Sequence, residues 1–347
     1  MGEDGDPLLF TAGDSNATSA GVRIFGGTLA DFTLRHIEAY GGVAPFTAGV
    51  AFQGGNPSNL SLRDSALLGG VSDVDAAEGV SAGLWFAGDC SGCLIDGNAI
   101  AGFSSQTAGR SVGIRMAVRN ALALNTTLIT NNLVGGGEGT TTHAFEIGGN
   151  GAEEVRVLHN YLYGGGGSDE SAAVYLRQVG DNVVVSGVDT PAVFGGNILD
   201  AGDGADAYGF FEQCRSNGVT ARRTEPARAA NSNFFPVTGV TALVRRADNT
   251  GGTCASVDVT SVAAVNGTGP YAVVGDCGEH YGVDPAFADD PLTDPTAGNA
   301  TLQDAADMTY ACAGDATWAP LFPDGAQMTD YFDTIRLVPD IGAYEVP

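Results

Sequence analysis

The chain has 347 residues, enough for one large domain or two ordinary ones, and its hydrophobic fraction of 44% excludes a disordered polymer. Its 41 acidic residues outnumber 15 basic ones, all of them arginine, and the net charge of −26 excludes nucleic acid and anionic membrane surfaces as electrostatic partners. No run of about eighteen apolar residues occurs, so the sequence predicts no membrane span.

The N-terminal residues 1–10 lack a basic stretch followed by an apolar one. We therefore expect that this chain does not contain its targeting segment. The six cysteines form an even set at positions 90, 93, 214, 254, 277 and 312. Such a set in an acidic, turn-rich chain favours disulfides, which persist outside the cytoplasm. These features predict an extracellular or cell-surface protein.

A short segment of alternating apolar residues recurs along the chain, and each copy begins with a glycine or an alanine. Its starts are separated by 34, 30, 31, 29 and 36 residues. Alternation with a period of two is typical of a half-buried strand. The copies begin at Gly49, Gly83, Gly113, Ala144, Ala173 and Gly209, and the pattern predicts inward side chains at Val50, Phe52, Leu84, Phe86, Ile114, Met116, Phe145, Ile147, Val174 and Leu176.

A second element follows each strand and has an asparagine two residues before a leucine or isoleucine. An asparagine at the same corner of every coil can stack on the asparagine of the next coil. Its amide can then form hydrogen bonds with backbone groups that a bend would leave unpaired. Degenerate copies begin at His36 and Ser65. The predicted ladder consists of Asn98, Asn131, Asn160 and Asn197.

The two repeats keep step over five coils, and no segment shows a clear helical period. Together they predict an all-β fold, a right-handed parallel β-helix that forms a single solenoid of about eight or nine coils with an irregular C-terminal cap. We assign residues 1–20 to an N-terminal cap, 21–281 to the coils (regular to about 215) and 282–347 to a C-terminal capping tail.

Cys90 and Cys93 form a CxxC motif with no second cysteine pair or histidine pair at the spacing of zinc ligands. The motif predicts a local or inter-coil disulfide. Pairing of six cysteines cannot be read from a sequence, and Cys254 with Cys277 is a further candidate pair.

The C-terminal region carries the segments Gly282-Val-Asp-Pro-Ala-Phe287 and Asp340-Ile-Gly-Ala-Tyr-Glu345. They resemble the closing module of bacterial right-handed β-helix surface proteins. The earlier coils are similar to the pectate-lyase-like superfamily in their repeat and asparagine ladder alone. This resemblance implies a bacterial protein that is secreted or attached to the cell surface. The motif set of polygalacturonase-type hydrolases is absent from the sequence, and the calcium cluster and arginine base of pectate lyases cannot be assembled from neighbouring coils.

The outward positions of the recurring strand form a row of aromatic and charged residues. Aromatic rings beside arginine suit the stacking and edge hydrogen bonding of sugars. The row therefore predicts a ligand-binding face, although a covered structural stripe is an alternative. Its candidate ligand-binding residues are Trp85, Arg115, Glu146, Tyr175 and Phe211, and in a lyase Arg115 or Arg177 would be the base, Tyr175 the acid and Glu146 the orienting group.

Asp200, Asp203 and Asp206 are weak candidates for calcium ligands, because their spacing does not match the twelve-residue calcium loop. No other cofactor is indicated. His159, which precedes the ladder Asn160, is predicted to be a turn residue.

The leading hypothesis is a secreted or cell-surface β-helix protein that contacts extracellular polysaccharide or another surface without catalysis. The alternative is a polysaccharide lyase or epimerase that acts on the outward row. A third hypothesis is a structural β-helix such as a tailspike or filament subunit. The sequence slightly favours a monomer.

Overall fold

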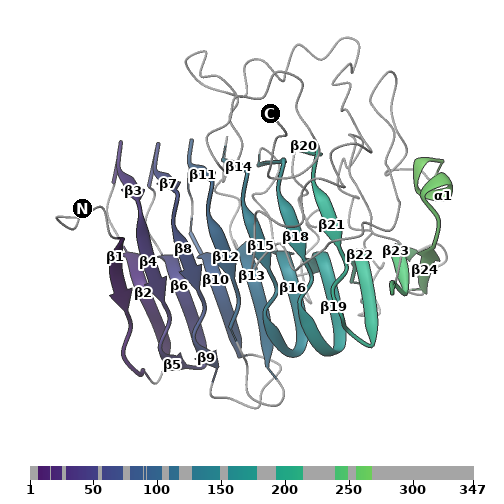
Figure 1. Ribbon diagram of the computed structural model, residues 1–347, viewed down its shortest axis with the longest axis horizontal. Coiled ribbons are helices and arrows are strands. Elements are labelled where there is room, and N and C mark those ends of the chain that lie inside the picture. Colours follow the sequence, from purple (N-terminus) through teal and green to yellow (C-terminus); the bar gives the residue numbers. More distant parts are fainter. Residues whose placement is uncertain are drawn as a thin grey trace, which may run out of the picture.

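The computed structural model is a parallel β-helix, in which successive coils stack side by side along one axis (Figure 1). This confirms the predicted all-β class and architecture. The structure describes residues 7–15, 17–25, 29–53, 57–72, 79–88, 90, 92–103, 109–116, 127–148, 155–177, 193–213, 239–248 and 255–267.

Each coil contributes one strand to each of three sheets. The first sheet contains β1 (Leu8–Thr11), β4 (Ile37–Tyr40), β8 (Ala66–Leu68), β12 (Ala99–Ala101), β15 (Leu133–Gly135), β18 (Tyr161–Tyr163) and β21 (Ile198–Asp200). The second contains β2 (Thr18–Phe25), β6 (Phe46–Gln53), β10 (Val80–Phe86), β13 (Arg110–Met116), β16 (Glu138–Gly148), β19 (Gly166–Arg177), β22 (Asp206–Glu212), β23 (Ala242–Asp248) and β24 (Ala255–Val259). The third contains β3 (Thr33–Arg35), β7 (Ser61–Arg63), β11 (Leu94–Asp96), β14 (Leu128–Thr130), β17 (Arg156–Leu158) and β20 (Val193–Gly195).

The third sheet has six strands, so six coils are complete in the described part of the chain, fewer than the eight or nine predicted. Parallel stacking ends at β23, because β24 pairs with it antiparallel. A short pair, β5 (Val43–Ala44) and β9 (Val71–Ser72), and one helix, α1 (Val262–Asn266), complete the described elements. The strands β1 and β2 begin inside residues 1–20, which the sequence analysis assigned to a cap; the predicted tail at 282–347 lies outside the described residues.

The core is a continuous column of apolar side chains inside the three sheets. All ten side chains that the alternation predicted to point inward are buried there, which confirms that prediction. Equivalent residues of neighbouring coils lie on one another: the rings of Phe52 and Phe86 stack with centroids 4.8 Å apart. Burial of such columns supplies most of the stabilising free energy of a solenoid.

Where the small residue that opens the strand repeat is glycine, it marks a close approach between the second and first sheets. A Cβ atom on Gly83 would lie 2.6 Å from Cγ2 of Ile100 and 2.7 Å from the carbonyl oxygen of Ala101. A Cβ on Gly113 would meet Val134 and Ala144 in the same way. The small residue is therefore required by sterics at the point where the strand bends.

The asparagine ladder lies at the corner between the third and first sheets, and it runs through Asn98, Asn132, Asn160 and Asn197. The Nδ2 atom of each of the first three donates to Oδ1 of the next, at 3.0, 2.9 and 3.0 Å. The backbone N–H of each donates to that same Oδ1 atom, at 3.0 Å in every case. Each Nδ2 also donates to two backbone carbonyl groups. The ladder thus pairs buried polar groups that the corner would otherwise leave open.

The assignment of Asn131 to the ladder was wrong by one residue. Asn131 has a φ of 55° and takes the left-handed position that precedes the ladder residue, as His159 (φ 53°) and Gly97 (φ 66°) do in their coils. Its Nδ2 atom donates to the side chain of Asp96 at 2.9 Å. Asparagine tolerates left-handed backbone better than most residues, which is why the Asn-Asn pair was ambiguous in the sequence.

A row of hydroxyl side chains that the sequence analysis missed lines the inside of the second sheet. Its members pair in register from coil to coil. All of them except Thr142 bind backbone groups of the adjoining turns, as when Gly70 N–H donates to Thr47 Oγ1 at 3.0 Å. Extending the strand repeat two residues toward the N-terminus would have revealed it. The row consists of Ser19, Thr47, Ser81, Ser111, Thr142 and Ser171.

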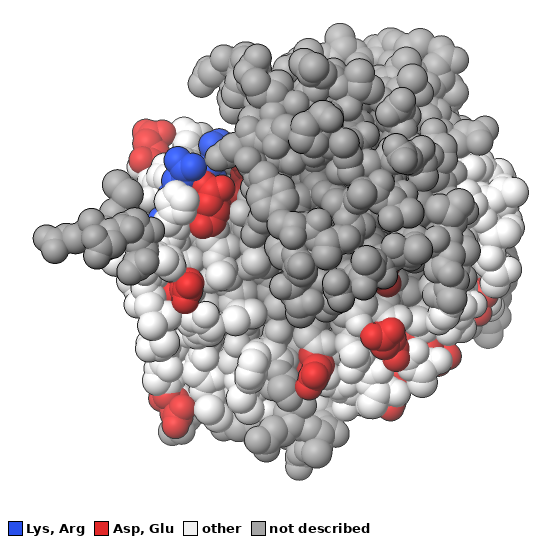
Figure 2. Space-filling view, in the orientation of Figure 1, with Lys and Arg blue, Asp and Glu red and all other residues white. Residues whose placement is uncertain are grey.

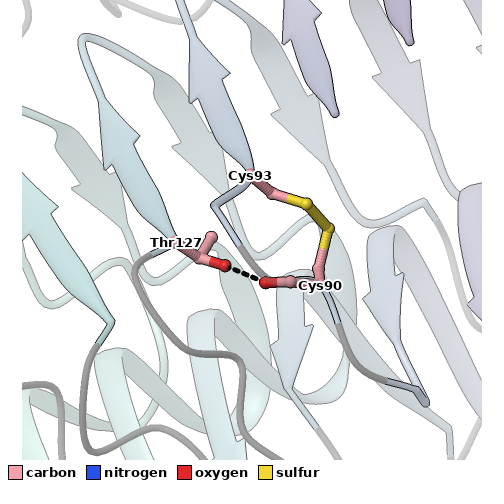
Figure 3. Close-up of a disulfide and its surroundings, with 3 residues drawn as sticks. All are labelled: Cys90, Cys93 and Thr127. Atoms are coloured by element: carbon pink, nitrogen blue, oxygen red, sulfur yellow. Dashed lines mark hydrogen bonds between the residues drawn. A yellow bond between two sulfur atoms is a disulfide. The ribbon is translucent and has the colours of Figure 1, made fainter. Parts of the chain in front are cut away.

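Cys90 and Cys93 form a disulfide, which confirms the local pairing of the CxxC motif (Figure 3). The carbonyl oxygen of Cys90 accepts a hydrogen bond from Thr127 Oγ1 at 2.5 Å, so the bridged loop is tied to the following coil. Cys254 and Cys277 lie outside the described residues.

The one-residue correction of the ladder can be tested by two neighbouring substitutions. Asn132→Ala removes the buried amide and leaves the partners of both its ends unpaired, so we expect the free energy of unfolding to fall by about 3 kcal/mol. Asn131→Gly keeps the left-handed backbone and loses one half-buried hydrogen bond, so it should cost less than about 1 kcal/mol. Urea denaturation of both variants measures the difference, and equal losses would contradict the corrected register.

Candidate functional site

The predicted outward row exists as a single register across the second sheet. Ala51, Trp85, Arg115, Glu146, Tyr175 and Phe211 are successive partners in the strand pairing. The same register adds Arg23 at one end and Arg245 at the other. The structure therefore brings all five candidate ligand-binding residues into one line, one residue per coil. The side chain of Arg177 lies outside the described residues.

Glu146 is the centre of a buried charge cluster on this face. Its side chain is 1% exposed. Arg110 Nε lies 3.2 Å from Oε2 and Arg115 Nε lies 3.4 Å from Oε1, so a guanidinium faces each carboxylate oxygen. His143 Nδ1 is 3.5 Å from Oε2, and His143 Nε2 is 3.2 Å from Oε1 of Glu170. The histidine thus bridges a buried and a partly exposed carboxylate.

Two opposing effects act on the pKa of Glu146. Burial by itself raises it, because a carboxylate loses its hydration. The charge of Arg110, the polar contact with His143 and the charge of Arg115 outweigh this and hold the pKa well below its ordinary value. Glu146 is consequently ionised and forms a structural ion-pair centre for the two arginines.

Aromatic rings extend the cluster toward the later coils. The Tyr175 ring stacks on His143 with centroids 4.0 Å apart, and it contacts Phe211 at 5.1 Å. Beyond them the Arg245 guanidinium lies 4.4 Å from the centre of the Tyr208 ring. Burial raises the pKa of the Tyr208 phenol to about 12, so this phenol is neutral. This half of the row is a packed block in which Tyr175 is buried.

The other end of the row is more accessible. Trp85 is partly exposed and stacks on Phe46 with centroids 5.8 Å apart, while the Arg115 guanidinium lies 5.7 Å from the indole ring. The indole Nε1 of Trp85 has no hydrogen-bond partner in the part of the chain that the structure describes, nor has Oε1 of Gln53. Both atoms are buried themselves, although their side chains reach the surface. This end therefore offers the partly exposed ring of Trp85, whereas the two unpartnered atoms lie beneath the surface.

Sequence reasoning missed Arg110, His143 and Glu170, which complete the cluster. They lie before the small residue that bends each strand, and the sequence analysis followed the alternation only after that residue. Pairing across the strands places Val112 beside His143, and Arg110 and Glu170 beside Thr141. The alternation changes phase at Gly113 and Ala144, so continuing it backward would have assigned Arg110 and His143 to the inner face.

The structure does not assemble the weak calcium candidates into a group. Asp200 accepts a hydrogen bond from the Tyr161 hydroxyl at 2.9 Å, and Asp203 accepts one from the Tyr163 hydroxyl at 2.6 Å. Asp206 starts β22 and is exposed. Among the residues described, no group of three or more histidine, cysteine or acidic side chains is arranged to hold a metal ion.

Charge on the described surface is sparse and mostly acidic on the face drawn in Figure 2. Two arginines on the third sheet pair with aspartates of the next coil, Arg35 with Asp64 at 2.5 Å and Arg63 with Asp96 at 3.8 Å. No helix in the described ranges is long and apolar enough to cross a membrane.

No protein-family model, curated protein or solved structure matches this chain. The structure supports the part of the noted resemblance that concerns the β-helix fold.

Loss of the central carboxylate should destabilise the whole face. Glu146→Gln leaves two guanidinium groups without their buried counter-charge, so we expect the free energy of unfolding to fall by about 3 kcal/mol. The matched control is Glu170→Gln, which alters a partly exposed carboxylate and should cost less than about 1 kcal/mol. Chemical denaturation compares the two, and a near-neutral Glu146→Gln would show that the cluster is not an ion-pair centre.

The lowered pKa of Glu146 also predicts a pH dependence. The unfolded chain takes up a proton at this residue near the ordinary value of about 4.3, whereas the folded chain does so at lower pH. The stabilisation is therefore complete above that ordinary value and is lost as the pH falls toward the folded pKa. Between about pH 5 and about pH 3, unfolding free energy should decrease more steeply in the native protein than in Glu146→Gln. If the unfolding free energy of the two proteins changed with pH in the same way, the lowered pKa of Glu146 would be contradicted.

Proposed function

We propose that this β-helix binds an extracellular polysaccharide through the Trp85 end of the outward row, where Phe46 stacks on the indole ring, and does not catalyse its cleavage. The observation that carries the proposal is Trp85. Its ring is partly exposed and is flanked by Phe46 and Arg115. Sugar rings stack on such aromatic faces and present hydroxyl oxygens at their edges that accept hydrogen bonds.

The arrangement of repeated coils also suits a polymer. Residues in register lie about 4.8 Å apart from one coil to the next, so a chain of sugars can lie along the row and meet side chains at a regular spacing. The Phe46, Trp85 and Arg115 side chains come from the three successive strands β6, β10 and β13. A polymeric ligand would therefore contact several coils at once.

The charge cluster argues against the lyase alternative. A base must accept a proton, and a guanidinium that faces a buried, ionised carboxylate keeps its own. Arg115 is held in this way by Glu146, and Tyr175 is buried between His143 and Phe211. Neither side chain is placed where it could exchange a proton with a bound substrate, as a catalytic acid or base must. This supports binding without turnover.

The test is binding of the protein to a panel of neutral and uronic-acid glycans, followed by the Trp85→Ala variant. We expect at least one glycan to bind and the affinity to fall about tenfold or more in the variant, because the stacking ring is lost. Phe103→Ala is the matched control, since Phe103 is an exposed aromatic residue outside the row, and its affinity should equal that of the native protein.

Three results would overturn the proposal. The first is absence of binding to every glycan by the folded protein, and the second is binding that Trp85→Ala leaves unchanged. The third is formation of unsaturated products that absorb in the near ultraviolet, which would establish a lyase instead.

A further inference from the structure

His143 is a buried titratable side chain that the proposed glycan site does not use. It lies on β16 and is 1% exposed, yet each of its ring nitrogens faces a carboxylate. Nδ1 lies 3.5 Å from Oε2 of Glu146, and Nε2 lies 3.2 Å from Oε1 of Glu170. The protonation state of the ring therefore decides which of these two contacts can be a hydrogen bond.

A neutral imidazole cannot satisfy both contacts at once. It carries one N–H and one nitrogen lone pair, so in either tautomer a lone pair faces an oxygen of one ionised carboxylate. The imidazolium has an N–H on both nitrogens and can donate to Glu146 and to Glu170 together. The placement of the ring between two carboxylates thus suits its protonated form.

The other groups around His143 act in opposite directions. On β19 the Tyr175 ring stacks on the imidazole with centroids 4.0 Å apart, and an aromatic face attracts a cation. On β13 the guanidinium groups of Arg110 and Arg115 repel a further positive charge. Both already face the oxygens of Glu146, at 3.2 and 3.4 Å, so without Glu170 three positive groups would share one carboxylate. The protonated ring therefore depends on Glu170.

The two carboxylates differ in how easily they can leave the ring. The Glu146 side chain is 1% exposed and lies between two guanidinium groups, whereas the Glu170 side chain is 24% exposed. A carboxylate at the surface regains hydration when it turns away from its partner, and a buried one does not. When His143 has only one proton to donate, Glu170 is consequently the partner that it loses.

The contacts of His143 connect three successive coils through their side chains. Arg110 and Arg115 belong to β13, His143 and Glu146 to β16, and Glu170 to β19. The contact between His143 and Glu170 extends this side-chain connection from β16 to β19, beyond the backbone pairing of the two strands. Loss of that contact shortens the connection by one coil.

We propose that His143 is a pH-dependent latch on the outward row. As an imidazolium it joins Glu146 to Glu170 and so connects three coils; as a neutral ring it keeps Glu146 and releases Glu170 to solvent. Histidine changes charge near pH 6.5 in the absence of other influences, so the latch works between about pH 5 and about pH 8. Its stabilising effect is present on the acid side of this range and is lost as the pH rises.

The test is the effect of Glu170→Gln on the unfolding equilibrium constant of the full chain, measured by urea denaturation. Glutamine keeps the size of the side chain and removes its charge. We expect the substitution to raise the unfolding constant about fivefold at about pH 5.5, where the latch is closed, and less than about twofold at about pH 8. Because Glu170 is partly exposed, the variant should fold, which circular dichroism checks.

His143→Gln identifies the group that titrates. In its background the effect of Glu170→Gln should be the same at both pH values, because the imidazole is absent. His36→Asn is the matched control, since His36 is an exposed histidine with a φ of 54°, a backbone conformation that asparagine tolerates. In the His36→Asn background the pH dependence should equal that of the native protein.

Three results would each overturn the inference. They are an effect of Glu170→Gln that is equal at the two pH values in the native background, a pH dependence that persists in His143→Gln, and one that disappears in His36→Asn. If His143→Gln does not fold, the comparison in the native background decides alone. Glycan binding that Trp85→Ala abolishes would leave the proposed function standing when this inference fails.

Discussion

The backbone N–H of one buried corner residue in each coil has to find a partner, and the side chain of the following coil provides it. Asn132 shows the whole arrangement: its Oδ1 accepts from the backbone and side chain of Asn98, and its Nδ2 donates to Asn160 and to two carbonyl groups. An apolar residue or a slip of one residue would leave several of these groups unpaired in the interior. The ladder thus fixes the register of each coil on the next, and every other row of the solenoid depends on that register.

The outward row is a consequence of the same register. Once the register is fixed, equivalent residues of successive coils lie beside one another. The chemistry of the face then depends on which side chain each coil places at that position. The sequence of Arg115, Glu146 and Tyr175 places a carboxylate between an arginine and an aromatic ring, and Arg110 and His143 close the cluster from the neighbouring row. The chain has a large excess of acidic residues. The charge of Glu146, however, is neutralised by the two guanidinium groups of Arg110 and Arg115. That pairing makes the middle of the row rigid and leaves the Trp85 end as its accessible part.

Much of this could be predicted from the sequence, because both repeats are local patterns with a fixed meaning. Alternation after Gly83 or Gly113 identifies inward and outward side chains, and stacking extends each assignment to the next coil. The wrong or missing predictions concern positions whose assignment cannot be decided from the sequence of one coil. Asn131 and Asn132 differ only in backbone conformation, and Asn131 takes the left-handed one. The rows of His143 and Ser111 lie beyond the bend at the small residue, where the simple alternation is interrupted by the close approach of two sheets.

The ends of a solenoid follow different rules from its middle, because stacking supplies each coil with a partner on both sides except there. In the interior the ladder residue is asparagine; toward the N-terminus it becomes Ser65 and then Ile37, so the hydrogen-bonding capacity of the corner decreases coil by coil. The apolar column does not decrease in parallel, because Leu8 and Phe10 are at least as large as their partners Ile37 and Ala39 in the next coil. The Leu8 N–H donates to the carbonyl oxygen of His36 at 3.1 Å, so the first described coil stacks on Ile37 without a ladder oxygen. The ladder therefore fixes the register of the middle coils, whereas backbone pairing and the apolar column hold the first one in place.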